Sequence, residues 1–234
     1  MSVQRLPVRP DLDQLKHQAK DLLTALRAGD PAAIGEFREH YPESIDSATA
    51  KLADAQLVLA RSYQASSWTR LVQAVKLVDA IWKDDLTAVR ALVTANRNLL
   101  NEETLIRTDS NWGPPMTYAA NLGRDRIIQM LHELGARDHR SALARAVLQG
   151  KIGTARMLHA LLGSPAAPAG ALGGPAYTLS VEGTAFAFEV GAGARVYDDA
   201  GNLLAPVGVV LQTDARNPAA KHAILEMYSQ HGVV

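Results

Sequence analysis

The residues best suited to acid–base or metal chemistry are the seven histidines, and their spacing favours neither use. They are His17, His40, His132, His139, His159, His222 and His231. No two of them lie four positions apart with a glutamate between, the arrangement that binds zinc on a protease helix. The chain has no cysteine, which excludes disulfides, thiol catalysis and cysteine-bound zinc. We therefore predict no catalytic residue, no metal ligand and no cofactor.

Other catalytic and ligand-binding motifs are absent or incomplete in the sequence. No serine lies in a Gly-x-Ser-x-Gly elbow, and the glycine-rich residues 170–174 lack the Lys-Ser or Lys-Thr of a phosphate-binding loop. Asp198 and Asp199 lack the ligand spacing of a calcium loop, so a tight turn is predicted at 198–202. An enzyme with an active site around residues 164–202 remains the alternative to a protein without catalytic function.

The charge balance of the chain also restricts its partners. Lys and Arg total 24 and so do Asp and Glu, so the formal net charge is zero. A neutral chain disfavours general binding to nucleic acid or anionic membranes, which requires an excess of basic residues. No stretch approaches the roughly 20 apolar residues that span a bilayer. Residues 1–20 contain no apolar segment of signal-peptide length. We predict a cytoplasmic protein.

Apolar residues recur at three- and four-residue steps along most of the chain, which predicts an all-α fold. The first series is Leu12, Leu15, Ala19, Leu22, Leu23 and Leu26. Gly29 is expected to end this helix, and Asp30 followed by Pro31 to start the next. Asn217 followed by Pro218 predicts the start of a last helix in the same way.

A change in composition interrupts this pattern at residues 163–175. Three prolines and four glycines in thirteen residues are typical of a flexible loop. Residues 180–190 combine a strand-like alternation of Phe186 and Phe188 with the signals of a capped helix that starts after Ser180. Of the two, a helix is favoured.

Four segments share one pattern, with a residue pair before a turn and apolar residues after it. The segments are Thr24–Phe37, Asp79–Leu92, Tyr118–Leu131 and Arg145–Leu158. The turn position is a glycine in three of them and Asp84 in the other. Small residues before the turn let a short helix approach its neighbour, and glycine ends that helix in a left-handed conformation. Such units cannot bury their apolar faces alone, so stacking is predicted.

This pattern resembles the ankyrin-repeat family, most clearly in DSNWGPPMTYAANLGRDRIIQMLHELGARD, residues 109–138. The positions that match are Asp109, Pro115, Met116, Ala119, Ala120, Gly123, Ile127, Ile128, Leu131, Gly135 and Ala136. Residues 141–163 match more loosely, and residues 193–202 are similar to the finger between repeats. Residues 114–117 depart from the family, because Pro-Pro-Met-Thr replaces the Thr-Pro-Leu-His that links adjacent turns. The segment LADAQLVLARSYQASSWTRL is similar to leaders that precede such repeats in bacterial proteins.

The resemblance implies an irregular ankyrin-like helical repeat solenoid. Its parts are a leader or cap region at 1–76, repeats at 77–163, a Gly/Pro-rich loop at 164–179 and a further divergent repeat at 180–234. It also implies a non-catalytic scaffold that recognises a partner protein through its concave face and finger loops. The residues expected on that surface are Trp82, Lys83, Trp112, Tyr118, Asn121, Leu122, Arg145, Leu148 and Gln149. The alternative is that Trp82 and Leu148 pack against a neighbouring cap.

Two further features bear on partners. No acid occurs between Asp138 and Glu182, whereas Arg140, Arg145, Lys151 and Arg156 are basic. This stretch is either a patch for an acidic partner or an ordinary solvated face. The last helix carries Ile224, Leu225, Met227 and Tyr228, more than one inward stripe requires. We expect this chain to be a fragment of a longer repeat protein; the alternatives are that its C-terminal end is buried by self-association or by folding back on the array.

Overall fold

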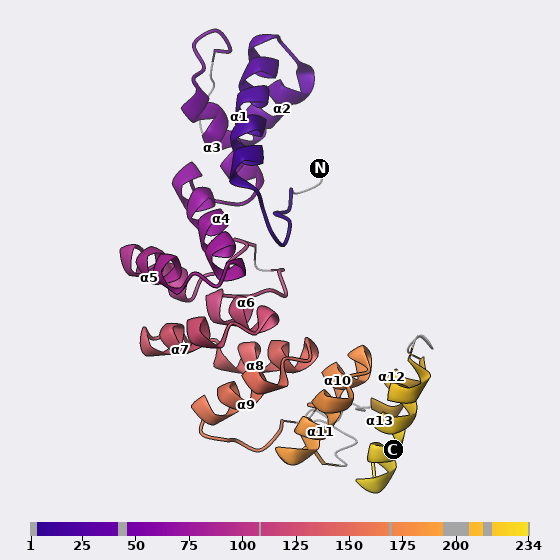
Figure 1. The fold of residues 1–234 in the computed structure, drawn as a ribbon. Helices are drawn as coiled ribbons and strands as arrows, with labels where there is room; N and C mark the ends of the chain where they lie inside the picture. Colours follow the sequence, from indigo (N-terminus) through magenta and orange to yellow (C-terminus); the bar gives the residue numbers. More distant parts are fainter. Residues whose placement is uncertain are drawn as a thin grey trace. The chain divides into compact units, whose positions relative to one another are not determined.

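The structure, a computed structural model, describes residues 4–41, 46–107, 109–168, 170–193, 206–212 and 217–233. Within these residues it contains thirteen α-helices, a short 3-10 helix and no strand (Figure 1). The all-α prediction is therefore confirmed for the described part of the chain. Internal contacts divide the chain into two units, residues 1–115 and residues 116–234.

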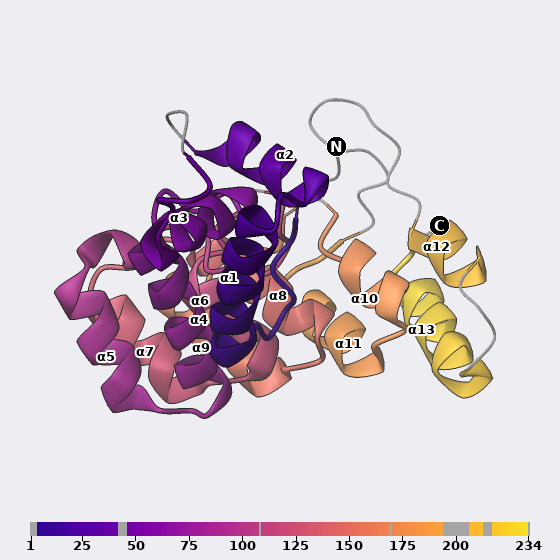
Figure 2. The same cartoon turned by 90° about the horizontal axis from the view of Figure 1, so that it is seen from above.

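The first unit is built from helices that pack on their neighbours in sequence. They are α1 (Leu12–Arg27), α2 (Pro31–His40), α3 (Leu52–Ser62), α4 (Trp68–Trp82), α5 (Leu86–Ala95) and the 3-10 helix η1 (Arg97–Leu100). Helix α1 packs against α2 and α3, as Figure 2 shows, and α4 packs against α3 and α5. The predicted start at Asp30 is confirmed, because its carboxylate accepts a hydrogen bond from the Ala33 backbone N–H at 2.9 Å.

Helix α1 holds the first unit together because its two halves belong to different apolar clusters. Its N-terminal half contributes Leu15 to a cluster with Leu71 of α4. Its C-terminal half contributes Leu26 to a cluster with Phe37 of α2 and Val58 of α3. The three- and four-residue spacing read from the sequence therefore serves two sets of neighbours.

The second unit consists of helices that pack in two rows. They are α6 (Pro115–Leu122), α7 (Asp125–Glu133), α8 (His139–Leu148), α9 (Ile152–Leu161), α10 (Gly173–Thr178), α11 (Val181–Glu189), α12 (Pro206–Gln212) and α13 (Pro218–Gln230). Helix α10 packs against α8 and α12, and α11 packs against α9 and α13 (Figure 1). The pair α10/α11 thus lies between the pairs α8/α9 and α12/α13.

Six helix–helix turns share one backbone arrangement. The residue at the turn has a positive φ in each; these residues are Gly29, Gln64, Asp84, Gly123, Gly150 and Leu179. The N–H of the next residue donates to the carbonyl five residues earlier, at 2.8–3.1 Å. The accepting carbonyls belong to Ala25, Ala60, Ala80, Ala119, Ala146 and Pro175. This is the Schellman ending of a helix, and it satisfies carbonyls that the helix leaves unpaired.

In the second unit these turns are regularly spaced. Gly123, Gly150 and Leu179 lie 27 and 29 residues apart. The second helix of each pair ends at a further left-handed glycine; these are Gly135, Gly163 and Gly191, each 28 residues from the next. Three successive helix pairs therefore have the same backbone turns at both ends of their second helix.

Side-chain contacts between successive pairs recur at the same positions. Gln129 of α7 donates to the sulfur of Met157 of α9 at 3.4 Å. The corresponding residues of the next two pairs are Arg156 and Phe186, whose guanidinium and ring centroid lie 5.5 Å apart. The same two positions are thus neighbours at both steps, although the residues that occupy them differ.

The predicted turns at Gly29, Asp84, Gly123 and Gly150 are confirmed. In α5, however, the buried position lies one residue later than the repeat pattern predicts. Leu131 and Leu158 are fully buried, as the pattern predicts, whereas in α5 the buried residue is Val93 and Leu92 is only half-buried. Helix α5 turns Val89 and Val93, one helical turn apart, toward the core.

The segment after α9 differs in part from the predicted loop at 164–179. Residues 173–178 form α10, so the loop prediction is wrong there. The helix favoured at 180–190 is confirmed as α11, with Ser180 capping it through the Gly183 N–H at 3.0 Å. Of the predicted finger at 193–202 and turn at 198–202, only Gly193 lies within the described residues.

The apolar residues of the last helix are mostly covered. Ile224 and Tyr228 are buried, and burial raises the pKa of the Tyr228 hydroxyl to about 12. Leu225 is half-buried against the same apolar cluster. The exposed large apolar side chains of this region lie on α12 instead, at Val209 and Leu211.

We predict that Leu131→Ala and Leu158→Ala each lower the free energy of unfolding by about 2–5 kcal/mol, because both remove fully buried side chains of the second helix row. Urea denaturation measures this directly. Leu52→Ala is the matched control, since Leu52 at the start of α3 is 36% exposed and its loss should cost clearly less than the loss of either buried leucine. Equal stability of all three variants would show that the packing described for α7 and α9 is wrong.

Candidate partner-binding surface

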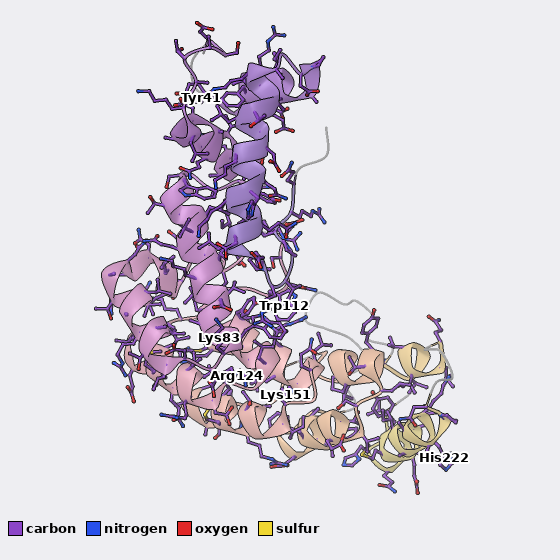
Figure 3. The ribbon with its side chains drawn as sticks, turned by 45° about the horizontal axis from the view of Figure 1, so that its top comes forward. Tyr41, Lys83, Trp112, Arg124, Lys151 and His222 are labelled. Carbon is purple, nitrogen blue, oxygen red and sulfur yellow. The ribbon has the colours of Figure 1, made fainter. Side chains whose placement is uncertain are left out.

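The nine residues predicted to bind a partner are divided between the two units. Trp82, Lys83 and Trp112 belong to the first unit. Lys83 is exposed, and its ammonium lies 2.6 Å from the Asp79 carboxylate on the preceding turn of α4 (Figure 3). Trp82 is half-buried, with the Arg9 guanidinium 5.3 Å from its ring centroid. This tryptophan therefore packs against the N-terminal segment of its own unit, which agrees with the alternative that it contacts a cap.

Trp112 lies in the segment that precedes α6 and is also half-buried (Figure 3). Its backbone N–H donates to the Ser110 hydroxyl at 3.2 Å, and Gly113 follows with a φ of +69°. The Gly113 carbonyl accepts from the Thr104 N–H at 3.1 Å. These bonds hold the backbone on both sides of Trp112.

Two predicted residues of the second unit are not exposed. Tyr118 is fully buried and Asn121 is 4% exposed, so the prediction that both lie on a free surface is wrong. Helix α6 is only eight residues long and is buried over most of its length, and both side chains lie in the buried part. Sequence spacing alone did not reveal how much of so short a helix would be covered.

Asn121 acts within the fold by positioning Arg145. Its side-chain N–H donates to the Thr117 carbonyl at 2.9 Å, and its side-chain oxygen accepts from Arg145 Nε at 2.7 Å. Arg145 is half-buried on α8, and this burial lowers the pKa of its guanidinium. A guanidinium stays charged under such a shift. The pair therefore links α6 to α8 and fixes the orientation of a positive charge.

A second polar link joins the same two helices. The Asp138 carboxylate accepts from both the backbone N–H and the hydroxyl of Thr117, at 2.8 and 2.6 Å. This link is not predictable from the resemblance, because Thr117 falls where the ankyrin pattern has histidine. Threonine and aspartate provide the connection here, with the negative charge near the N-terminus of α6.

The remaining predicted residues of the second unit form a surface together with Tyr177, which was not among the residues predicted from the sequence. Leu122 and Leu148 are half-buried and Gln149 is exposed. Leu148 lies 3.6 Å from the position that a Cβ would take at Gly174 of α10, so part of its side chain covers the next helix. The missed residue is Tyr177 of α10, which is 73% exposed.

Tyr177 occupies in α10 the place of Leu148 in α8, two residues before the left-handed turn position in each case. The repeat pattern could have identified it, but its helix lies in the Gly/Pro-rich stretch and its turn residue is leucine rather than glycine. We refer to Leu122, Arg145, Leu148, Gln149 and Tyr177 as the α6–α8–α10 surface. Large aromatic and arginine side chains of this kind are enriched at binding hot spots.

Basic residues also mark the turns beside this surface. Arg124 and Lys151 each follow a left-handed glycine, at Gly123 and Gly150, and both are labelled in Figure 3. The aliphatic part of Lys151 lies 3.3 Å from the position of a Cβ at Gly123. These side chains add positive charge where the carbonyl ends of α6 and α8 are located.

A pocket of about 580 Å³ lies between α9 and α11 and bears on the enzyme alternative. Arg156 forms an ion pair with Glu189, and this hydrogen bond lowers the pKa of the Glu189 carboxyl. His159 Nε2 lies 2.8 Å from the Pro165 carbonyl oxygen. The glutamate therefore bonds to an arginine and the histidine to backbone, and neither bonds to Ser164. These residues do not form the nucleophile–base–acid arrangement of an acyl-transfer site.

Metal binding and membrane crossing find no support in the described ranges. His132 Nδ1 and His139 Nε2 lie 2.8 Å apart, a proximity that sequence spacing did not predict. No group of three or more His, Asp or Glu side chains in the described residues is placed to hold a metal ion. No helix among them is long and apolar enough to cross a bilayer.

Comparison with known proteins assigns no family. No protein-family model matches the chain, and no curated protein matches it. The likeness to ankyrin repeats therefore depends on the residues and geometry of this chain.

We predict that the Asn121–Arg145 bond couples the two residues by about 1 kcal/mol in a double-mutant cycle of Asn121→Ala and Arg145→Met, because each single change leaves the other partner unpaired. The free energy of unfolding of the four proteins gives the coupling. Arg126→Ala is the control, since this exposed side chain on α7 should couple to neither. Strictly additive effects for Asn121 and Arg145 would contradict the assigned bond.

Proposed function

We propose that this chain is a non-catalytic binding scaffold, an irregular ankyrin-like helical repeat solenoid that recognises a partner protein. In the second unit, the binding surface is the α6–α8–α10 surface. The observation that carries the proposal is Tyr177, an aromatic side chain that is 73% exposed on a helix packed between two others. An exposed tyrosine on a fixed backbone offers a large contact area at a small cost in conformational entropy.

The recurring turns support the solenoid part of the proposal. Helix pairs with left-handed turns at 27- and 29-residue intervals are typical of stacked repeats, in which each unit contacts mainly its neighbours. In the second unit, the short first helices, the small residues before each turn and the glycine at two of the three turns agree with the ankyrin pattern. Because a fold does not determine a function, the step from solenoid to partner binding depends on the surface residues.

Catalysis is not part of the proposal because the residues of the α9–α11 pocket bond to one another and to backbone. Arg156, His159 and Glu189 are the titratable side chains in that pocket. Arg156 and Glu189 pair with each other, and His159 bonds to the Pro165 carbonyl. A binding scaffold needs no cofactor and no metal. We also propose a cytoplasmic location, with which a sequence without cysteine agrees.

We predict that the double variant Tyr177→Ala/Gln149→Ala loses partner proteins that the wild-type chain captures. The full-length chain is immobilised, exposed to cell lysate and analysed by quantitative mass spectrometry. Proteins held by the wild type should decrease about tenfold or more, because hot-spot truncations cost more than about 1.4 kcal/mol. Leu52→Ala, on the exposed side of α3, serves as control and should capture the same proteins as the wild type. An identical set of proteins on all three baits would contradict the proposed surface.

A further inference from the structure

Helix α8 and the turn that follows it carry basic side chains that form no ion pair within the described residues. No acid occurs between Asp138 and Glu182 in the sequence. Of the four basic residues in this stretch, Arg156 forms an ion pair with Glu189. The other three, Arg140, Arg145 and Lys151, form no ion pair with any residue that the structure describes. The patch that the sequence suggested therefore narrows to α8 and the turn after it.

Arg145 differs from the other two cations because it is held in place. Asn121 accepts from its Nε at 2.7 Å, and Asn121 is itself fixed by a 2.9 Å bond to the Thr117 carbonyl. The terminal amino groups of the guanidinium have no acceptor among the described residues. A guanidinium fixed through Nε presents its remaining N–H groups in a planar fork, which matches the two oxygens of a carboxylate. Arg140 and Lys151 are exposed and lack such a support.

The residues that precede this arginine on the exposed side of α8 are small. Ser141 and Ala144, on the exposed side of α8, are small. Leu148 and Tyr177 provide apolar contact area on α8 and α10, which pack against each other. A charged group among small and apolar side chains favours a ligand that has a carboxylate flanked by uncharged residues.

We infer that the α6–α8–α10 surface binds an acidic segment of the partner protein, with an aspartate or glutamate carboxylate accepting hydrogen bonds from the terminal amino groups of Arg145. Arg140 and Lys151 add attraction over a longer range and contribute mainly to the rate of association. A nucleic-acid backbone fits less well, because the chain has equal numbers of acids and bases and only one of these cations is oriented. This inference rests on the proposed function and specifies the partner chemistry for the same surface.

The test uses a library of random peptides displayed on phage and selected on the immobilised full-length chain. Peptides recovered on the wild type are expected to be enriched in Asp and Glu. Arg145→Glu should remove this enrichment and favour Lys and Arg, whereas Arg145→Lys should preserve it. Arg126→Glu is the matched control, since Arg126 is an exposed arginine of α7 outside this surface. For a selected acidic peptide, Arg145→Gln should weaken binding about tenfold or more, because a charged hydrogen-bonded pair is lost.

The outcomes separate the inference from the proposed function. Equal enrichment of acids on the wild type and on Arg145→Glu, with both variants folded by circular dichroism, would overturn the inference. Wild-type peptides without a preference for acids would also overturn the inference. If Tyr177→Ala failed to bind those peptides, the α6–α8–α10 surface would still be a binding surface, but not one for an acidic segment. If Tyr177→Ala and Arg145→Glu retained all peptides bound by the wild type, the proposed surface itself would be wrong.

Discussion

The fold depends on one backbone constraint, the left-handed residue that ends the first helix of each pair. After it, an N–H bonds to the carbonyl five residues earlier, which ends the helix and reverses the chain within two to five residues. The accepting carbonyl belongs to alanine at five of the six turns and to proline at the sixth. A small residue there lets the next helix approach closely, so the same position satisfies the backbone and allows the packing. The second helix then buries its leucine or equivalent against the neighbouring pair.

This constraint also determines what the surface can do. Because the turns recur at 27- and 29-residue intervals, equivalent positions of α6 and α8 face the next helix pair in the same way. Asn121 contacts Arg145 at one step, and at the next Leu148 contacts Gly174, which are the corresponding positions one pair later. The backbone relation is retained while the side chains change from a polar pair to an apolar contact. Specificity for a partner can vary at these positions without a change in the fold.

Much of the fold was predictable from local signals, and the exposed surface was less so. Gly29, Asp84, Gly123 and Gly150 could be assigned as turns because few residues tolerate a positive φ, and the leucine spacing predicted the second helices. Leu179 could not, since leucine gives no sign of a left-handed turn, and the helix α10 before it was taken for loop. Burial of Tyr118 and Asn121 depends on how completely neighbours cover a short helix, which single-helix periodicity does not encode. The Thr117–Asp138 link was not predicted, because it joins a threonine and an aspartate, whereas the family pattern links adjacent turns through its threonine and histidine.

The most direct test of this account compares two glycine-to-alanine changes in adjacent elements. Gly150 has a φ of +66° and Gly153 lies within helix α9, and at neither would an added Cβ meet any atom within 4 Å. Side-chain crowding is therefore absent at both positions, and only backbone preference differs. We expect urea denaturation to show Gly150→Ala less stable than the wild type by roughly 1–2 kcal/mol and Gly153→Ala more stable by about 0.5–1 kcal/mol. A Gly150→Ala protein as stable as the wild type would contradict the claim that left-handed turns build this fold.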